Sequence, residues 1–368
     1  MNELDETLAQ LHRDARSAPG SLDNARRNLM AAVDAESARP GNGEVVALRP
    51  RRRRVLPIAA AAAAVLALAA VGIQLGAPSG TPGSTSGDPG QPAVVLLSAS
   101  QVLTKAADLS VGAVDQPVGP GQYRYIVQHG WVQRSVEKPP VGGKPVGYSY
   151  LWETRTQRWI PADYRDTWQE NRTVLDKSKF LAGSAPQSQD PVPDLGPYDQ
   201  GQWRGACGDF FPKVKPVKVC GDANDWDSPT FYAKLPRDPG QLYAFLTDLT
   251  KVRGSAPDVM FHYGVEILRA GLMPADLRAQ WYRALAKIPG IQVVDRTTDL
   301  DGRSGTAIGL GDEHEQDQLV IDQATGAMIG TRVVAGTQPD FPWIKPGTEL
   351  ETTAISTAVV NGLGKTPA

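Results

Sequence analysis

Cysteine is the residue type whose spacing in this chain points most directly to chemistry. Cys207 and Cys220 enclose twelve residues, and Gly-Asp follows each of them. Outside the cytoplasm such a pair predicts a disulfide, which would contribute about 3 kcal/mol by closing a loop. Two unpaired thiols are the alternative. A redox role is not indicated, because the Cys-x-x-Cys arrangement is missing, and two cysteines with four histidines do not predict a zinc site.

Three short segments approach catalytic motifs but depart from each of them. Gly302-Arg303-Ser304-Gly305 lacks the Gly-x-Ser-x-Gly spacing of a nucleophile elbow. His314-Glu315 would open a zinc-protease helix, but Gln318 stands where the second histidine belongs. Gly364-Lys365-Thr366 resembles the end of a phosphate-binding loop without its leading glycine. We therefore predict no catalytic residues, no cofactor and no enzymatic activity.

An acidic run, Asp312, Glu313, Glu315 and Asp317, has the oxygen ligands that calcium prefers. It falls between two short segments with strand character. The sequence therefore favours a solvated hairpin loop over a calcium site, and no metal site is predicted.

Tryptophan and aliphatic residues between positions 152 and 281 suggest either a packed core or an apolar cleft. An antiparallel sheet with one buried face requires a cover, and predicted helices follow the aromatic strands. If that cover is incomplete, a concave aromatic pocket for an acyl chain or an extended peptide results. The candidate lining residues are Trp152, Trp159, Trp168, Leu246, Ile267 and Trp281.

One uncharged segment, residues 55–75, is long enough to cross a membrane. Its 21 residues would form a helix of about 31 Å, close to the thickness of a bilayer core. Arg49 and Arg51–Arg54 precede it and no basic residue follows before Lys105, which predicts a cytoplasmic N-terminus. A buried alanine-rich helix and a cleaved signal peptide are the alternatives. We expect a single-pass protein of the cell membrane.

The segments on either side of the predicted transmembrane helix differ in character. Residues 1–54 contain two short amphipathic patterns, which indicate either a docking segment for a cytoplasmic partner or a loosely ordered tail. Residues 76–97 are rich in Gly, Pro and Ser and predict a flexible linker. Residues 98–368 then form the predicted extracytoplasmic domain.

Periodicity divides that domain into strands, then helices, then strands. A helix is expected at 98–108, and alternation predicts early strands with a turn at Thr156-Gln157. Proline and capping signals predict three helices, which begin near Asp238, Pro257 and Pro274. Later strands are expected at 291–297, 305–310, 318–322 and 327–334. This order favours an α+β fold, a curved antiparallel sheet covered by helices on one face.

Several turn and cap motifs carry a resemblance to a known family. They are Tyr123-Arg124-Tyr125, Leu235–Pro239, Pro274–Arg278, Leu285–Gly290, Asp301–Gly305 and Ile321–Gly326. Together with the arginine cluster and the apolar segment, they resemble a family of actinobacterial single-pass membrane proteins often encoded near extracytoplasmic-function sigma factors. The order of elements is also similar to the half-open barrel of the lipoprotein carriers LolA and RseB.

The resemblance implies a membrane-anchored sensor or regulator of the envelope. Its tail would act on a sigma factor, and its outer domain would bind a lipid, a peptide or an envelope protein. The alternative is an envelope carrier or scaffold whose tail is only an anchor. The net charge of −2 gives no indication of a nucleic-acid partner.

Overall fold

The computed structural model of the protein describes residues 97–111, 115–184, 195–212 and 219–367. The predicted tail, transmembrane helix and most of the linker lie outside these residues. Within them, no helix has both the length and the apolar character needed to span a bilayer.

The strands of the described chain form one open antiparallel sheet of nine strands, in the order β4-β3-β2-β1-β9-β8-β7-β6-β5. The sheet consists of two meanders, β1–β4 and β5–β9, joined where β1 pairs with β9. The strands are β1 (Tyr123–Val141), β2 (Lys144–Pro161), β3 (Thr167–Gly183), β4 (Gly201–Ala206), β5 (Gln292–Thr298), β6 (Ser304–Gly311), β7 (Glu315–Ile321), β8 (Met328–Ala335) and β9 (Glu349–Val360).

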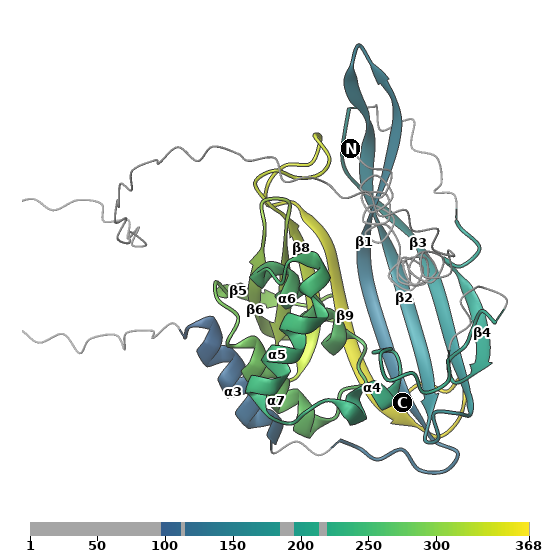
Figure 1. Cartoon of the computed structure of the whole chain (residues 1–368). Coiled ribbons are helices and arrows are strands. Elements are labelled where there is room, and N and C mark those ends of the chain that lie inside the picture. The colour runs from purple at the N-terminus through teal and green to yellow at the C-terminus, as the bar shows by residue number, and fades with distance from the viewer. Residues whose placement is uncertain (1–96, 112–114, 185–194, 213–218, 368) are drawn as a thin grey trace, which may run out of the picture. The chain divides into compact units, whose positions relative to one another are not determined.

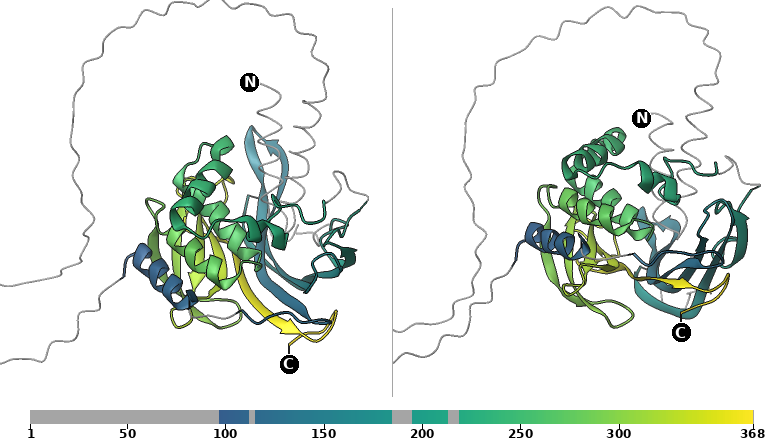
Figure 2. Two further views of the ribbon diagram at one scale, coloured as in Figure 1. Left: turned by 60° about the horizontal axis from the view of Figure 1, so that its bottom comes forward. Right: turned by 90° about the horizontal axis from the view of Figure 1, so that it is seen from below.

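Helices lie against only one part of this sheet. Helix α6 contacts β6, β7 and β8, and α7 packs against α3 and α5; no described helix makes a comparable contact with β1–β4. Figures 1 and 2 show this helical layer beside the β5–β8 part, with the β1–β2 hairpin projecting beyond it. The helical elements are α3 (Ala99–Val111), α4 (Pro229–Lys234), α5 (Pro239–Leu249), the 3-10 helix η2 (Lys251–Arg253), α6 (Pro257–Arg269) and α7 (Ala275–Leu285).

The predicted α+β architecture is confirmed, but one predicted turn is wrong. Strand β2 runs without a break through Thr156 and Gln157, which pair with Gln128 and Val127 of β1. Neither residue is one that favours a turn, and β-branched Thr156 suits an extended strand. The tight turn of this hairpin is instead at Gly142-Gly143, whose φ values of 60° and 75° suit glycine.

The predicted helix starts are close to those observed. The side chain of Asp238 accepts a hydrogen bond from the amide of Gln241, which caps α5, and Pro239 occupies its first turn. Pro257 opens α6, and Pro274 immediately precedes α7. These helices enclose the largest apolar cluster of the described chain, which includes Leu103, Leu246, Phe261, Ile267, Trp281 and Leu285.

Strand register assigns side chains to the two faces of the sheet. Directly paired residues of an antiparallel sheet lie on the same face, and that face alternates along each strand. Ile308 and Leu319 pack in the helix-covered core, so we call their face the helix-side face and the other the back face. One continuous row on the helix-side face runs through Ile308, Leu319, Thr331, Thr353, Gly130, Thr154 and Val174.

Candidate functional site

The six predicted cleft residues do not lie together. Leu246, Ile267 and Trp281 belong to the core cluster under the helices. The three strand tryptophans occupy three other clusters. Trp152 is two residues from Thr154 and therefore on the helix-side face, whereas the alternation along β2 puts Trp159 on the back face.

An aromatic stripe on the helix-side face of β2 is the most distinctive feature of the β1–β4 part. Tyr148, Tyr150 and Trp152 occupy successive positions of this face, and we call them the aromatic ladder. Their ring centroids are 6.0 Å and 5.8 Å apart, within the range of favourable aromatic contacts. The ladder is buried, and its apolar neighbours on β1 and β3 are Val136, Val174 and Phe180.

Two cations from β1 lie over the aromatic ladder. The guanidinium carbon of Arg134 is 4.7 Å from the centre of the Trp152 ring, and the amine of Lys138 is 5.5 Å from that of Tyr148. Both distances are those of cation–π contacts. Arg134 also contacts Asp199 at 3.3 Å. Burial lowers the pKa of Arg134, although nearby carboxylates oppose the change, so its charge sits in an environment that disfavours it.

Two buried donors of this site lack an acceptor. The Nε of Arg134 and the Nε1 of Trp152 are both inaccessible to water and form no hydrogen bond. Leaving a buried donor unpaired costs about 1–3 kcal/mol. Four other tryptophans donate their ring N–H to a protein acceptor: Trp159 to Lys365 O, Trp168 to Tyr164 O, Trp281 to Gly264 O and Trp343 to Ser149 Oγ.

Between the ladder and α6, the helix-side face carries small side chains. The row next to Trp152 contains Thr154, Gly130 and Thr353. A Cβ at Gly130 would lie only 2.7 Å from the Thr353 hydroxyl, so the backbone here approaches its neighbour closely. The site therefore has an aromatic side on β2 and a floor of small residues on β1, β2 and β9.

A layer of charged residues under α6 borders this floor. Arg269 of α6 contacts Glu351 of β9 at 2.8 Å and Glu266 at 3.3 Å. His262, two turns before Arg269 on α6, contacts Asp317 of β7 at 3.0 Å. Burial lowers the pKa of His262, but Asp317 and the other nearby carboxylates raise it more, to about 9. Burial raises the pKa of Glu266 despite Arg269.

A second ion network lies on the same face nearer β4. The carboxylate of Glu170 is fully buried and forms ion pairs with Arg158 and Arg172, each at 2.7 Å. Arg158 also reaches Asp227, just before α4, at 2.9 Å. Burial alone would raise the pKa of Glu170, but the two guanidinium groups bring it below its ordinary value. Glu170 is therefore a buried charge that depends on both arginines.

On the back face, a histidine lies between two carboxylates. His129 Nε2 is 2.8 Å from Glu153 and its Nδ1 is 3.0 Å from Asp301, in the turn between β5 and β6. In the same turn, Arg303 donates to the carbonyls of Ile329 and Ile355. Both ring nitrogens of His129 contact carboxylates, so the ring is not paired with a nucleophile. These contacts attach the β5–β6 turn to the central strands. The sequence motif at residues 301–305 predicted a turn, but it gave no indication of these contacts with residues far away in the chain.

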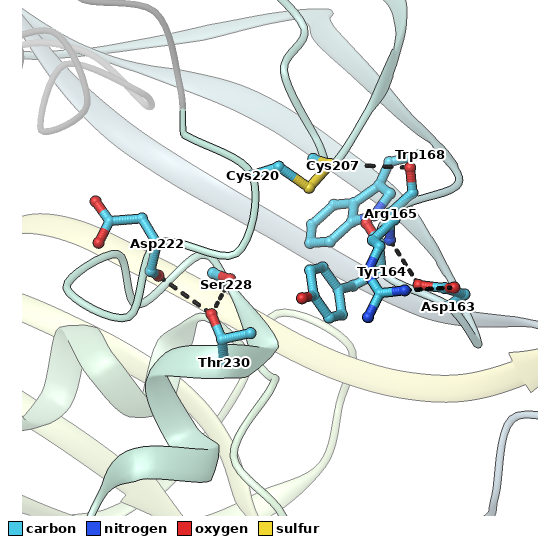
Figure 3. The surroundings of a disulfide bond; sticks show 9 residues. All are labelled: Asp163, Tyr164, Arg165, Trp168, Cys207, Cys220, Asp222, Ser228 and Thr230. Carbon is cyan, nitrogen blue, oxygen red and sulfur yellow. Dashed lines mark hydrogen bonds and ion pairs between the residues drawn. A yellow bond between two sulfur atoms is a disulfide. The ribbon is translucent and has the colours of Figure 1, made fainter.

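The predicted disulfide between Cys207 and Cys220 is present, as Figure 3 shows. It links the end of β4 to the segment that leads into α4. The glycine after each cysteine has a positive φ and lies against an aromatic ring: Gly208 against Trp168, and Gly221 against Tyr164. A side chain at either position would collide with that ring, which explains the glycine in the repeated Cys-Gly-Asp sequence.

The acidic run spans the turn between β6 and β7 and the start of β7, which holds Glu315 and Asp317. Asp312 accepts hydrogen bonds from the amides of His314 and Glu315, so its carboxylate stabilises the turn. In the described ranges, no group of three or more His, Cys, Asp or Glu residues is arranged to hold a metal ion.

Comparison with known proteins gives no family assignment. The sequence matches no protein-family model and no curated protein.

Proposed function

We propose that this protein is a membrane-anchored sensor or regulator of the cell envelope, and that the domain after the linker binds an extended or amphipathic ligand. The binding surface is the helix-side face of β1–β3, with the aromatic ladder on one side and α6 on the other. In this proposal, residues 55–75 form the membrane anchor and residues 1–54 face the cytoplasm, where they act on an extracytoplasmic-function sigma factor.

The uneven cover of the sheet is the observation that carries this proposal. Helix α6 lies on β6, β7 and β8, whereas the aromatic ladder on β2 is buried in a small aromatic cluster of its own, apart from the large apolar core. Aromatic rings with a few placed polar groups are typical of ligand sites. A sheet that is only partly covered by helices is also what a half-open barrel of the LolA type requires, so the proposed fold and the proposed binding role agree.

Site-specific photocrosslinking in cells tests the binding role, because it captures a ligand whose identity is unknown. A photoreactive phenylalanine derivative replaces Tyr150 in the full-length chain, and the matched control places it at Arg155 on the opposite face of β2. We expect a discrete adduct at position 150, identified by mass spectrometry, and none at position 155. The absence of an adduct at 150, or the same adduct at both positions, would contradict the proposal.

The alternative role, a carrier or scaffold with a purely anchoring tail, differs from the regulator only at the N-terminus. The test compares the full-length chain with a chain that lacks residues 1–50, for binding to extracytoplasmic-function sigma factors of the same cell. Binding that requires residues 1–50 supports the regulator. Equal or absent binding of the two chains would favour the carrier or scaffold.

A further inference from the structure

The bond between Cys207 and Cys220 differs from a disulfide enclosed in a core, because solvent reaches it. Cys220 is exposed, and Cys207 is half-buried at the end of β4. Val219, beside Cys220, is 66% exposed, so this side of the bond lies at the surface. A thiolate reaches such a bond without unfolding of the protein, and exposed disulfides are more often labile or regulatory than buried ones.

The backbone at Cys207 is held in a conformation that suits glycine better than cysteine. Cys207 and Gly208 have φ values of 59° and 68°, and the amide of Asp209 donates to the carbonyl of Ala206 at 3.0 Å. These are the features of a type I′ turn, whose central positions favour Gly, Asn or Asp. Among the residues that the structure describes, only Cys207 and Ser255 combine a side chain with a positive φ. Breaking the bond lets Cys207 leave this strained conformation, which favours the reduced form.

The bond also determines where residues 219–228, the segment before α4, lie against the sheet (Figure 3). Besides the disulfide, Gly221 packs against an aromatic ring in the β2–β3 turn, and Asp227 contacts Arg158 of β2 at 2.9 Å. Arg158 also pairs with Glu170 of β3 at 2.7 Å, and that contact does not involve the segment. At its other end the segment continues into α4, whose buried aromatic residues belong to the large apolar core. Without the disulfide, the segment is therefore held firmly at α4 and weakly at β4.

We infer that the Cys207–Cys220 bond is a redox switch, which a dithiol protein of the thiol–disulfide oxidoreductase class opens. Reduction releases residues 219–228 from β4 and separates Asp227 from Arg158, while the domain stays folded. The missing Cys-x-x-Cys arrangement argues against a catalytic dithiol in this chain, but it does not concern a disulfide that another protein reduces. This inference is independent of the proposed binding function.

The reaction is a thiol–disulfide exchange in two steps. A thiolate of the dithiol protein attacks Sγ of the exposed Cys220, which breaks the bond to Cys207 and leaves Cys207 as a thiolate that takes up a proton. The second thiolate of the dithiol protein then attacks its own sulfur in the mixed disulfide and releases Cys220, which is protonated in turn. Two electrons and two protons pass to the chain, and the dithiol protein ends with a disulfide.

The rate of reduction in urea tests whether the bond opens in the native protein. The full-length chain in phosphatidylcholine nanodiscs is treated with reduced thioredoxin, and alkylated thiols are counted by mass spectrometry. We expect the rate in about 1 M urea to differ less than about twofold from the rate without urea, because no unfolding is required. A bond that opens only through global unfolding would be reduced about tenfold faster or more at that concentration. That result, or a native bond that thioredoxin does not reduce, would overturn the switch.

Hydrogen exchange measured by mass spectrometry tests what reduction releases. Amides of residues 219–228 should exchange about tenfold faster or more in the reduced chain, whereas the β6–β7 turn at 312–315 should keep its rate. The double variant Cys207→Ser/Cys220→Ser should match the reduced chain and should not respond to thioredoxin. Unchanged exchange at 219–228 would contradict the inference, since the bond would not hold this segment in place. Faster exchange throughout the domain would also contradict it, because the bond would then maintain the whole fold.

Discussion

The two parts of the sheet bury their helix-side faces with different residues. Beneath the helices, β6 and β7 contribute aliphatic side chains such as Ile308 and Leu319 to one large cluster. On β1–β3, aromatic rings, paired charges and a nearby disulfide take their place, in several small clusters. The first arrangement depends on apolar area, and the second depends on a few specific partners.

This difference has a consequence for mutational sensitivity. A large apolar cluster distributes its stability over many contacts, so the loss of one polar bond changes little. A small cluster built around a buried charge loses much of its stability when that charge is removed. The following predictions compare matched substitutions in the two parts of the sheet.

The largest effect is expected at Glu170 of the β1–β4 part. Glu170→Gln removes the one described carboxylate that pairs with Arg172 in a buried position, whereas Arg158 retains Asp227 at 2.9 Å. We expect a loss of about 3–5 kcal/mol in the free energy of unfolding, measured by urea denaturation of the full-length chain.

The matched control is Glu266→Gln under α6. Its partner Arg269 retains Glu351 at 2.8 Å, so no buried guanidinium is left unpaired. We expect a loss of less than about 1 kcal/mol. An equal loss for the two substitutions would abolish the proposed distinction between the two parts of the sheet.

The disulfide gives the next effect. Replacing both Cys207 and Cys220 by serine should lower the free energy of unfolding by about 3 kcal/mol, since the unfolded chain regains the entropy of an open loop. Adding a reductant to the wild-type chain should produce a similar loss, and it should not affect the serine variant. If a reductant left the free energy of unfolding of the wild-type protein unchanged, the disulfide would make no contribution to stability.

The parts of the fold that local signals determine could be predicted from the sequence. The helix starts at Asp238, Pro257 and Pro274 follow from capping and proline, and the Cys207–Cys220 bond follows from two cysteines close in sequence. Strand β9 could not be placed in this way, because its pairing with β1 joins residues far apart in the chain, such as Val132 and Glu351.

The candidate site was only partly accessible to sequence reasoning. The aromatic side chains of β2 were recognised, but the faces of Trp152 and Trp159 depend on an unbroken strand, and the predicted turn at Thr156-Gln157 concealed that register. The stacking of Arg134 on Trp152 depends on cross-strand pairing and has no local sequence signal.

A pH dependence should distinguish the charged layer under α6. The pKa of His262 is about 9 in the folded protein, above its ordinary value of 6.5, so protonation favours folding. Its stabilising contribution is complete below about pH 6.5 and is lost as the pH rises through about 9. The side chain is 34% exposed, and with this solvent screening we expect about 1–2 kcal/mol.

Urea denaturation of the wild type and His262→Gln between pH 6 and 10 measures this contribution. The stability difference between the two proteins should shrink over that interval, since the variant lacks the titrating group. A difference that stays constant with pH would contradict the proposed role of Asp317 as the charge partner of His262.

The smallest effect compares one substitution at two buried tryptophans. Trp281 donates its ring N–H to the carbonyl of Gly264 at 3.0 Å, whereas Trp152 forms no such bond. Phenylalanine at either position retains an aromatic ring but removes the N–H. Trp281→Phe loses packing and a satisfied hydrogen bond, for about 2 kcal/mol, whereas Trp152→Phe also removes an unsatisfied donor and should cost less than about 1 kcal/mol. Urea denaturation of both variants without added ligand measures the difference.

If Trp152→Phe proved as destabilising as Trp281→Phe, Trp152 would be an ordinary core residue, and the β2 face would lose its distinction from the helix-covered part. If the two differ as expected, the ring N–H of Trp152 does not contribute to the free energy of unfolding, whereas that of Trp281 does.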